Sequence, residues 1–239
     1  MDFQHPKDGV FVKLASTQVI DMILLAGVDF AIIDLEHSAL DTSAALALVR
    51  HADAIGLPAV VRIPEVDKGL VNRVLEAGAS GLQLSMTTRV SQVHALLDAM
   101  HYPPRGSRSL SNSHPGARYG ALSTRDYLAL AAGAPPLAVV QIETARTVDP
   151  LNAIAAAGAD VVFIGGTDLS VDVGLSTERL NKAVQSIVAS AECAGVVLGG
   201  AGIDHLPQNR YRVSASDVVL LGHALTSVPR AASPQGGVT

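Results

Sequence analysis

The stretch Leu137-Ala138-Val139-Val140-Gln141-Ile142-Glu143 is an apolar run that ends in a carboxylate. The stretch Val161-Val162-Phe163-Ile164-Gly165-Gly166-Thr167-Asp168 repeats this pattern further along the chain. Short, continuously apolar runs are typical of strands that are buried on both faces of a parallel sheet. A carboxylate just past such a run lies at the mouth of the sheet. Two of them from neighbouring strands can bind one hard divalent cation through oxygen.

The same alternation of apolar runs and helical patterns extends along most of the chain. Eight runs are predicted to be strands, at residues 10–14, 30–35, 59–63, 81–85, 137–142, 161–165, 196–199 and 218–221. Residues with helical spacing lie between them, at 42–54, 68–77, 89–100, 148–157 and 177–194. Asp41 is suited to cap the first of these helices, and Gly78, Gly158 and Gly195 to end later ones. This order predicts a (β/α)8 TIM barrel as a single domain over residues 1–231.

Three segments depart from this order. Residues 102–125 form a long polar stretch, and loops of that length in compact domains are usually functional or ordered by a partner. Residues 200–216 are short for a helical crossover and contain Pro207, which predicts a stunted helix there. The tail at 232–239 is rich in Ser, Pro and Gly and is predicted to be flexible.

The composition excludes several classes of protein. The chain has 239 residues, of which 49% are hydrophobic and 16% charged, so it can bury a large core. A net charge of −5 and an aromatic content of 3% without Trp argue against a nucleic-acid-binding protein. The longest apolar region, 128–142, is interrupted by Gly133, Pro135 and Pro136, which argues against a membrane span. The first residues lack the pattern of a signal peptide, so a cytoplasmic protein is predicted.

In such a barrel the functional site lies at the carboxyl ends of the strands. The polar residues predicted at those ends are Asp34, Glu36, His37, Arg62, Gln141, Glu143 and Asp168. Glu36 would point away from Asp34 and His37 if the strand continued, which favours a structural role for it. The first and last strands are predicted to contribute little charge. No Lys is predicted to end a strand within this set, which argues against a Schiff-base aldolase.

Other interpretations of the same residues stay open at this point. Arg62 is also suited to a structural ion pair with Glu143, His37 to a hydrogen-bonded loop position, and Asp168 to capping the helix that follows it. The glycines of Gly199-Gly200-Ala201-Gly202 and Gly222 suggest a phosphate site near the last two strands. That alternative leaves the pair of carboxylates unexplained.

A set of short motifs, in order along the chain, resembles the HpcH/HpaI aldolase/citrate lyase family of metal-dependent class II pyruvate aldolases. The resemblance runs from about residue 10 to residue 231. Each motif is weak by itself, but the ordered set is specific. The motifs are Asp34-x-Glu-His37, Val61-Arg62-x-Pro64, Val74-Leu-Glu-Ala-Gly-Ala79, Tyr102-Pro-Pro-x-Gly106-x-Arg108, Gln141-Ile-Glu143-Thr144 and Phe163-Ile-Gly165-x-x-Asp168-Leu169-Ser170.

The resemblance implies a role for each of these residues. Glu143 and Asp168 match the family's metal ligands, for Mg, Mn or Co. Arg62 matches the arginine that binds the 2-oxo acid and its enolate. The remaining matches are His37 as catalytic base, Asp34 as its orienting carboxylate, Gln141 as a polar residue beside the metal, and the backbone at Gly166 and Thr167 as a carboxylate pocket. The family also forms hexamers built as dimers of trimers, so a homo-oligomer is expected.

The residue types are consistent with that chemistry. A cation held by two carboxylates acts as a Lewis acid toward a 2-oxo acid, and an arginine adds fixed positive charge where an enolate oxygen develops. The expected activity is cleavage or formation of 4-hydroxy-2-oxo acids from a pyruvate enolate and a carbonyl acceptor. A condensing or decarboxylating enzyme that uses oxaloacetate is an alternative, and a barrel that only binds or assembles is another.

The chain departs from the family pattern at four places. The family usually reads Gly-Pro-Ala-Asp where this chain has Gly165-Gly166-Thr167-Asp168. It often has Pro at Ser85, Gly at Ser109 and Asp at Ala224. The metal ligands are retained, so these departures bear on the acceptor and not on the enolate chemistry.

Overall fold

The chain folds into a closed barrel of eight parallel strands, in the order β1 to β8. The computed structural model describes residues 1–203 and 205–228, so the predicted tail at 232–239 and the domain boundary at residue 231 lie outside the described residues. The barrel confirms the predicted fold class. The strands are β1 (Lys7–Val12), β2 (Phe30–Asp34), β3 (Ala59–Ile63), β4 (Gly81–Leu84), β5 (Leu137–Ile142), β6 (Val161–Gly165), β7 (Val197–Ala201) and β8 (Tyr211–Ser216).

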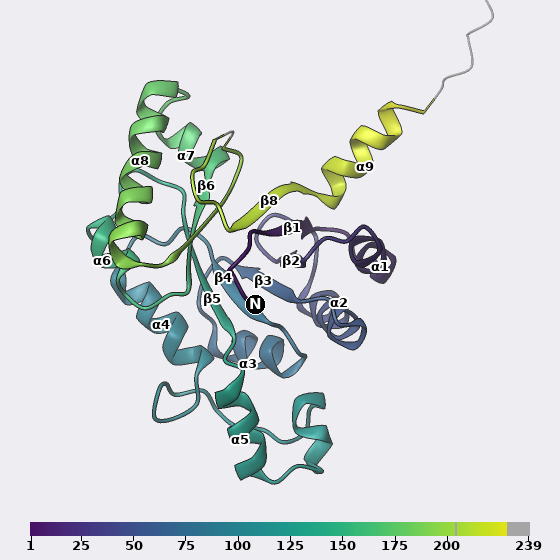
Figure 1. Ribbon diagram of the computed structural model, residues 1–239. Helices are drawn as coiled ribbons and strands as arrows, with labels where there is room; N and C mark the ends of the chain where they lie inside the picture. The colour runs from purple at the N-terminus through teal and green to yellow at the C-terminus, as the bar shows by residue number, and fades with distance from the viewer. Residues whose placement is uncertain (204, 229–239) are drawn as a thin grey trace, which may run out of the picture.

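Helices connect most of the strands. They are α1 (Thr17–Leu25), α2 (Thr42–Ile55), α3 (Lys68–Glu76), α4 (Val90–Met100), α5 (Thr124–Gly133), α6 (Leu151–Ala155), α7 (Gly166–Asp172), α8 (Thr177–Ala194) and α9 (Asp217–Thr226). In the ribbon α1 to α4, α6 and α8 lie around the strands, whereas α9 extends away from them (Figure 1). Within the described residues, no helix is both long and apolar enough to cross a membrane.

The predicted helix ends follow from capping chemistry. Asp41 accepts a hydrogen bond from the N–H of Ala44 at 2.8 Å, and α2 ends at Gly56 with φ 78°. Helix α8 spans the residues that its sequence predicts, and Gly195 ends it at φ 67°. Helix α6 is shorter than the predicted 148–157, because Pro150 occupies the position just before its first residue.

The eighth strand is not where the sequence predicts it. The apolar residues 218–221 belong to α9, and the strand is Tyr211–Ser216. Tyr211 is fully buried inside the barrel, where its ring stacks on Phe30 at 4.4 Å between centroids. The strand alternates inward and outward residues, a weaker signal than the apolar run that follows it. The predicted stunted helix at 200–216 is also wrong, since the described residues between β7 and β8 form turns.

One glycine shows why Tyr211 fits there. A Cβ on Gly199 of β7 would lie 2.8 Å from the carbonyl oxygen of Tyr211 and 3.0 Å from its Cβ. Glycine at this position therefore lets β8 and its ring approach β7. A methyl group would push the two strands apart.

The long polar segment at 102–125 is partly helical. It contains a short 3-10 helix at Pro115–Gly120 and the first residues of α5, whose N-cap Ser123 accepts the N–H of Asp126 at 3.2 Å. Its side chains form hydrogen bonds with the outer helices, between Ser107 and Lys68, Ser109 and Asn72, and Tyr119 and Arg50. Arg108 is buried and lies over the ring of Tyr102 at 4.7 Å. Part of this segment is therefore ordered by its own chain.

Candidate active site at the carboxyl ends of the strands

Asp34 and Arg62 lie side by side because β2 and β3 pair with these two residues in register. The Arg62 Nε donates to Asp34 Oδ1 at 2.9 Å and its Nη2 to Oδ2 at 2.6 Å. Both residues are buried, at 0% and 5% exposure. The paired contacts hold the guanidinium in one orientation at the end of its strand. The open alternative of an Arg62–Glu143 ion pair is wrong, since the ion pairs of Arg62 go to Asp34 and Glu36.

Asp34 also ends its strand. Its Oδ1 accepts the N–H of Glu36 at 3.0 Å and that of His37 at 3.1 Å, which turns the chain away from the sheet. Burial alone would raise the pKa of Asp34, but the hydrogen bond and charge of Arg62 and the two backbone donors outweigh it and hold the pKa below its usual value. Asp34 is therefore ionised at neutral pH.

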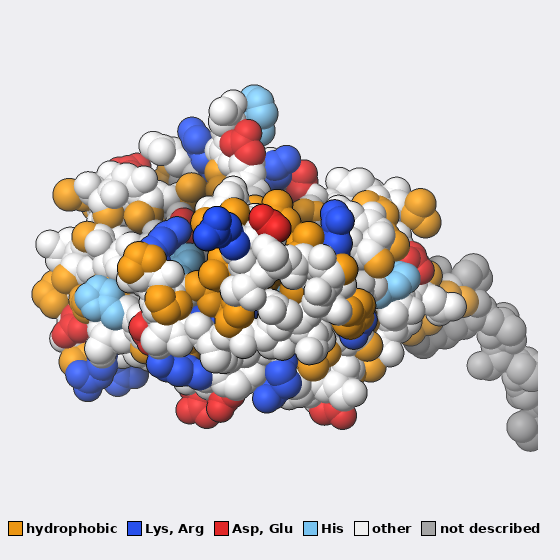
Figure 2. Space-filling model, turned by 90° about the horizontal axis from the view of Figure 1, so that it is seen from below, with side chains coloured by type: hydrophobic (Ala, Val, Ile, Leu, Met, Phe, Trp, Pro, Cys, Tyr) orange, Lys and Arg blue, Asp and Glu red, His pale blue; other side chains and the backbone are white. Residues whose placement is uncertain are grey.

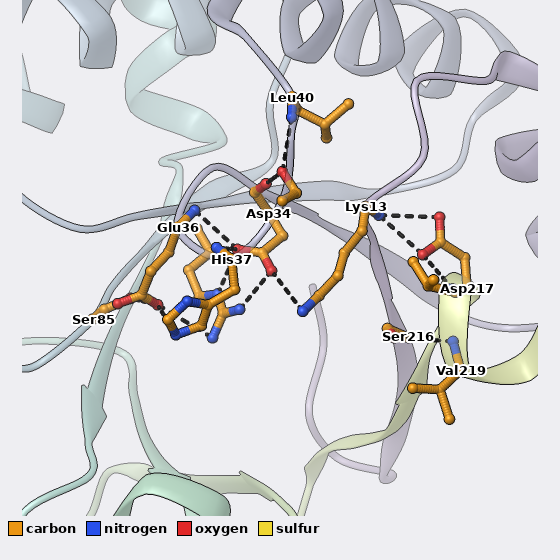
Figure 3. A network of polar contacts seen from close by, with 12 residues as sticks. Lys13, Asp34, Glu36, His37, Leu40, Ser85, Ser216, Asp217 and Val219 are labelled. Carbon is orange, nitrogen blue, oxygen red and sulfur yellow. Dashed lines mark hydrogen bonds and ion pairs between the residues drawn. The ribbon is translucent and has the colours of Figure 1, made fainter. Parts of the chain in front are cut away.

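Glu36 lies close to Arg62 and His37, contrary to the prediction that it points away from Asp34 and His37. Its Oε2 accepts a hydrogen bond from Ser85 Oγ at 2.5 Å and lies 3.3 Å from Arg62 Nη1. The same oxygen is 3.8 Å from His37 Nε2 (Figure 3). The prediction failed because β2 ends at Asp34, so the alternation of a strand no longer applies two residues later.

His37 is held by Asp34 through its backbone and not through its ring. The carboxylate nearest to the imidazole is that of Glu36, and the His37 side chain is 55% exposed. The imidazole is therefore accessible to solvent. Asp34 was expected to orient His37, and it does so by fixing the backbone of that residue. Glu36 is the acidic neighbour of the His37 ring, which the sequence did not indicate.

Lys13 is a second residue that the sequence analysis missed. It follows β1 directly, and its Nζ lies 3.4 Å from Asp34 Oδ2. Asp217, which follows β8, accepts the N–H of Lys13 with both oxygens at 3.0 Å (Figure 3). The first and last strands thus bring charge to the site, and a lysine does follow a strand there. The sequence signal that could have indicated Lys13 is its place directly after an apolar run, two positions after Phe11. The ring of Phe11 lies 4.4 Å from the Arg62 guanidinium carbon.

Glu143 follows β5 and is almost completely buried, at 3% exposure. Its Oε1 accepts the N–H of Met86 at 2.7 Å, and its Oε2 accepts a hydrogen bond from Gln141. Gln141 is itself held by Gln83 of β4, whose Nε2 donates to it at 2.6 Å. A Cβ on Gly165 would lie 2.7 Å from Glu143 Oε2, so the glycine leaves room for this carboxylate.

The electrostatics of Glu143 indicate a concentration of negative charge. Burial is the largest cause that raises its pKa, the hydrogen bonds from Met86 and Gln141 oppose it, and the negative charges of Glu36 and Asp168 raise it further. The net effect is a pKa above the usual value. A buried carboxylate with acidic neighbours is the donor chemistry that a hard divalent cation requires.

Gly166, Thr167 and Asp168 form the first turn of α7, which begins directly after β6. Asp168 is the third residue of the helix and Gly165 is its N-cap, so the alternative that Asp168 caps the helix is wrong. Thr167 and Asp168 are exposed at the mouth. Among the residues that the structure describes, no group of three or more His, Cys, Asp or Glu side chains is arranged as a complete metal site. The two carboxylates with water or substrate oxygens fit a cation of oxygen preference better than a closed protein cage.

Two glycines of the phosphate-site alternative have packing roles within β7. Gly199 and Gly200 lie within β7, and a Cβ on Gly200 would meet the side chain of Leu206 at 2.7 Å. Gly222 lies within α9, the helix that extends away from the barrel. The described structure therefore gives no support to a phosphate cradle formed by these residues.

Known proteins share both the sequence pattern and this architecture. Residues 7–231 match the HpcH/HpaI aldolase/citrate lyase family. The chain is 30% identical to a hydroxypyruvate/pyruvate aldolase of Deinococcus radiodurans over 238 residues, covering 95% of this chain and 83% of the relative. It is 33% identical to a 4-hydroxy-2-oxovalerate aldolase of Novosphingobium aromaticivorans over 199 residues, covering 79% of this chain and 74% of the relative.

A solved structure agrees as well. The crystal structure of a HpcH/HpaI aldolase/citrate lyase family protein from Burkholderia cenocepacia superposes with a TM-score of 0.83 at 28% identity, over 93% of this chain and 92% of that one. The match to the family covers nearly the whole barrel, including every strand end described above. The chain belongs to the HpcH/HpaI aldolase/citrate lyase family and is an enzyme of the aldolase or lyase type.

Proposed function

We propose that the protein is a divalent-metal-dependent aldolase that forms or cleaves 4-hydroxy-2-oxo acids through a pyruvate enolate. The observation that carries this proposal is the charge arrangement at one end of the barrel. Glu143 and Asp168 follow the neighbouring strands β5 and β6, and Arg62 and His37 lie at the ends of β3 and β2. The aldolase names of the relatives at 30% identity or more support the same chemistry.

Glu143 and Asp168 are the proposed metal ligands, with Gln141 holding Glu143 in place. A bound Mg, Mn or Co ion would supply Lewis-acid stabilisation of negative charge on a 2-oxo acid. The substrate carboxylate is proposed to lie against the backbone amides of Gly166 and Thr167, because the first N–H groups of a helix lack partners within it. Metal binding thus uses side chains of two strand ends, and carboxylate binding uses the backbone between them.

Arg62 is proposed to stabilise the enolate oxygen. Its guanidinium is fixed by Asp34, and its Nη1 lies 3.3 Å from Glu36 Oε2. A charge fixed before the reaction needs no rearrangement as the enolate forms. His37 is proposed to move a proton at the acceptor side, since its ring is half exposed and imidazole exchanges protons near neutral pH.

A homo-oligomer is the proposed assembly, with the hexamer of the family as its expected form. Helix α9 carries Val218, Val219, Leu220 and Leu221 at 43%, 49%, 49% and 48% exposure, and Leu225 at 61%. A helix that is apolar on all sides is normally buried. On the face shown in Figure 2, apolar side chains also lie among the acidic and basic ones. A second copy of the chain would cover these surfaces.

The test is an assay with purified protein, pyruvate, an aldehyde and one divalent metal at a time. We expect metal-dependent aldol addition, and exchange of the pyruvate methyl protons with solvent deuterium without any aldehyde. Oxaloacetate is tested in parallel, because a condensing or decarboxylating enzyme would turn it over faster than any aldol substrate. Absence of both exchange and turnover with every metal would favour a barrel that only binds or assembles.

A further inference from the structure

Lys13 stands apart from the residues assigned above. Its side chain is 25% exposed at the mouth of the barrel, and within residues 1–203 and 205–228 its ion pair is the 3.4 Å approach of Nζ to Asp34 Oδ2. Its backbone is fixed, because Asp217 accepts the N–H groups of both Lys13 and Leu14. Figure 3 shows the side chain reaching from this anchor toward Asp34. The long, flexible side chain of Lys13 therefore places its ammonium group near Asp34.

Asp34 does not require the charge of Lys13. Its two oxygens already receive two hydrogen bonds from Arg62 and two from the backbone of Glu36 and His37. The influences that set the pKa of Asp34 are burial, Arg62 and those backbone donors. An ammonium group has three donors, and one long contact leaves most of that capacity for a ligand.

The order of strands places Lys13 across the mouth from the proposed metal ligands. In the closed ring β1 lies between β8 and β2, while Glu143 and Asp168 follow β5 and β6 on the opposite side. A 2-oxo acid bound at Glu143 and Asp168 therefore has its reacting end there. A longer substrate would reach from there across the mouth toward β1, where Lys13 lies. The group that meets Lys13 belongs to the acceptor half of the molecule.

We propose that Lys13 binds a carboxylate on the acceptor half, so that the enzyme favours 4-hydroxy-2-oxo acids with a second carboxylate and anionic aldehydes or ketones as acceptors. This inference rests on the proposed aldolase function and adds its substrate class. Arg62 is less suited to this task, since its Nε and Nη2 are engaged by Asp34 and its Nη1 lies beside Glu36. An ammonium on a flexible stem binds a carboxylate as a point charge without demanding a fixed plane.

Two ligands of equal chain length test the proposal without turnover. 2-Oxoglutarate carries a carboxylate at the end where 2-oxopentanoate carries a methyl group. Calorimetry in the presence of Mn²⁺ should show tighter binding of 2-oxoglutarate to the native protein. In Lys13→Met this preference should fall by about 10- to 100-fold, the range expected for a hydrogen bond to a charged group. Lys13→Arg should retain most of the preference, because it keeps the charge.

Turnover provides the second readout. With pyruvate as donor, the ratio of kcat/KM for glyoxylate to that for glycolaldehyde should fall in Lys13→Met by a similar factor. Lys7→Met is the matched control, because Lys7 lies on the same strand but pairs with Asp29 outside this network. Lys7→Met should leave unchanged both the binding preference for 2-oxoglutarate and the kcat/KM ratio of the two acceptors.

Three results would overturn the proposal. Equal losses for the two ligands, or for the two acceptors, would assign Lys13 a structural role in the Asp34 network. Unchanged ratios would show that the ammonium does not meet the substrate. Trapping of pyruvate on Lys13 by borohydride, detected by mass spectrometry, would make it a Schiff-base residue instead. Failure of the proposed function would look different: the native protein would not exchange the methyl protons of pyruvate, while calorimetry would still report on Lys13.

Discussion

Arg62 and Asp34 form a buried ion pair with two contacts, of 2.9 and 2.6 Å, between adjacent strands at the mouth of the barrel. The pair links two strands and fixes the guanidinium that we propose to act in the reaction. It joins the ends of β2 and β3, and it fixes the guanidinium beside Glu36, whose carboxylate lies 3.8 Å from the His37 ring. A change on either side of the pair therefore affects folding as well as turnover, and the two effects need separate measurements.

Replacement of Asp34 by Asn should destabilise the protein in a pH-dependent way. Removing one partner of a buried pair costs about 3 kcal/mol at neutral pH. The pKa of Asp34 is lowered in the folded state, so its contribution is fully present above the unfolded value and is lost as the pH falls through the lower folded value. Urea unfolding from about pH 7 to about pH 3 should show the difference from the native protein shrinking with acid.

Asp53→Asn is the control for this measurement, since Asp53 is exposed on α2. It should unfold like the native protein throughout. A constant difference between Asp34→Asn and the native protein over the whole pH range would contradict the ion-pair explanation.

Glu143→Gln and Asp168→Asn should abolish metal-dependent activity and weaken Mn²⁺ binding, because each removes a proposed anionic ligand. Glu178→Gln, an exposed change in the first turn of α8, should do neither. A chelator should inactivate the native protein, and added Mn²⁺ or Mg²⁺ should restore it. The raised pKa of Glu143 means that protons compete with the cation, so Mn²⁺ affinity should fall as the solution becomes more acidic. Full activity in excess chelator would rule out the metal site.

Replacement of Arg62 by Ala and of His37 by Ala should have different effects on decarboxylation and on aldol addition. We propose that the charge of Arg62 stabilises the enolate in both reactions, so Arg62→Ala should depress oxaloacetate decarboxylation and aldol addition alike. His37→Ala should depress aldol addition by about 10²- to 10⁴-fold and decarboxylation less, because decarboxylation needs no proton at an acceptor. Asp34→Asn should depress both reactions, as a milder Arg62 defect, because the carboxylate of Asp34 fixes the guanidinium.

The comparison uses initial rates of both reactions for each variant, with His94→Ala as the control because His94 is exposed on α4. If His37→Ala loses both activities equally, its role lies on the enolate side or in the structure of the loop. In that case the assignment to the acceptor side is withdrawn.

Helix α9 should be part of a subunit interface. The double change Leu221→Glu and Leu225→Glu places two charges on a helix whose apolar residues are about half exposed in the single chain. Light scattering after size exclusion should show the native protein as an oligomer and the variant as a smaller species. Val148→Glu, an equally exposed apolar position, should keep the native assembly. A monomeric native protein with full activity would contradict both the interface and the proposed assembly.

The sequence by itself determined the repeating unit of this protein. The apolar runs of β2 to β6 are continuous because both faces of a parallel barrel are buried, and the helices between them start and end at capping residues such as Asp41 and Gly195. The predicted residues at the strand ends followed from the same pattern. Asp34, Arg62, Gln141 and Glu143 all lie at the mouth because each stands where its apolar run stops.

Only the tertiary structure decided which strand closes the barrel and which charges meet at its mouth. Residues 218–221 are the more apolar segment, but β8 is Tyr211–Ser216 because the ring of Tyr211 packs on Phe30 inside the barrel and Gly199 leaves it room. Glu36 joins the site because β2 ends two residues before it. Lys13 does so because the closing of the ring brings β1 beside β2 and β8. The contacts of Lys13 with Asp34 and Asp217 likewise depend on chain segments that are distant in sequence, which a local pattern does not report.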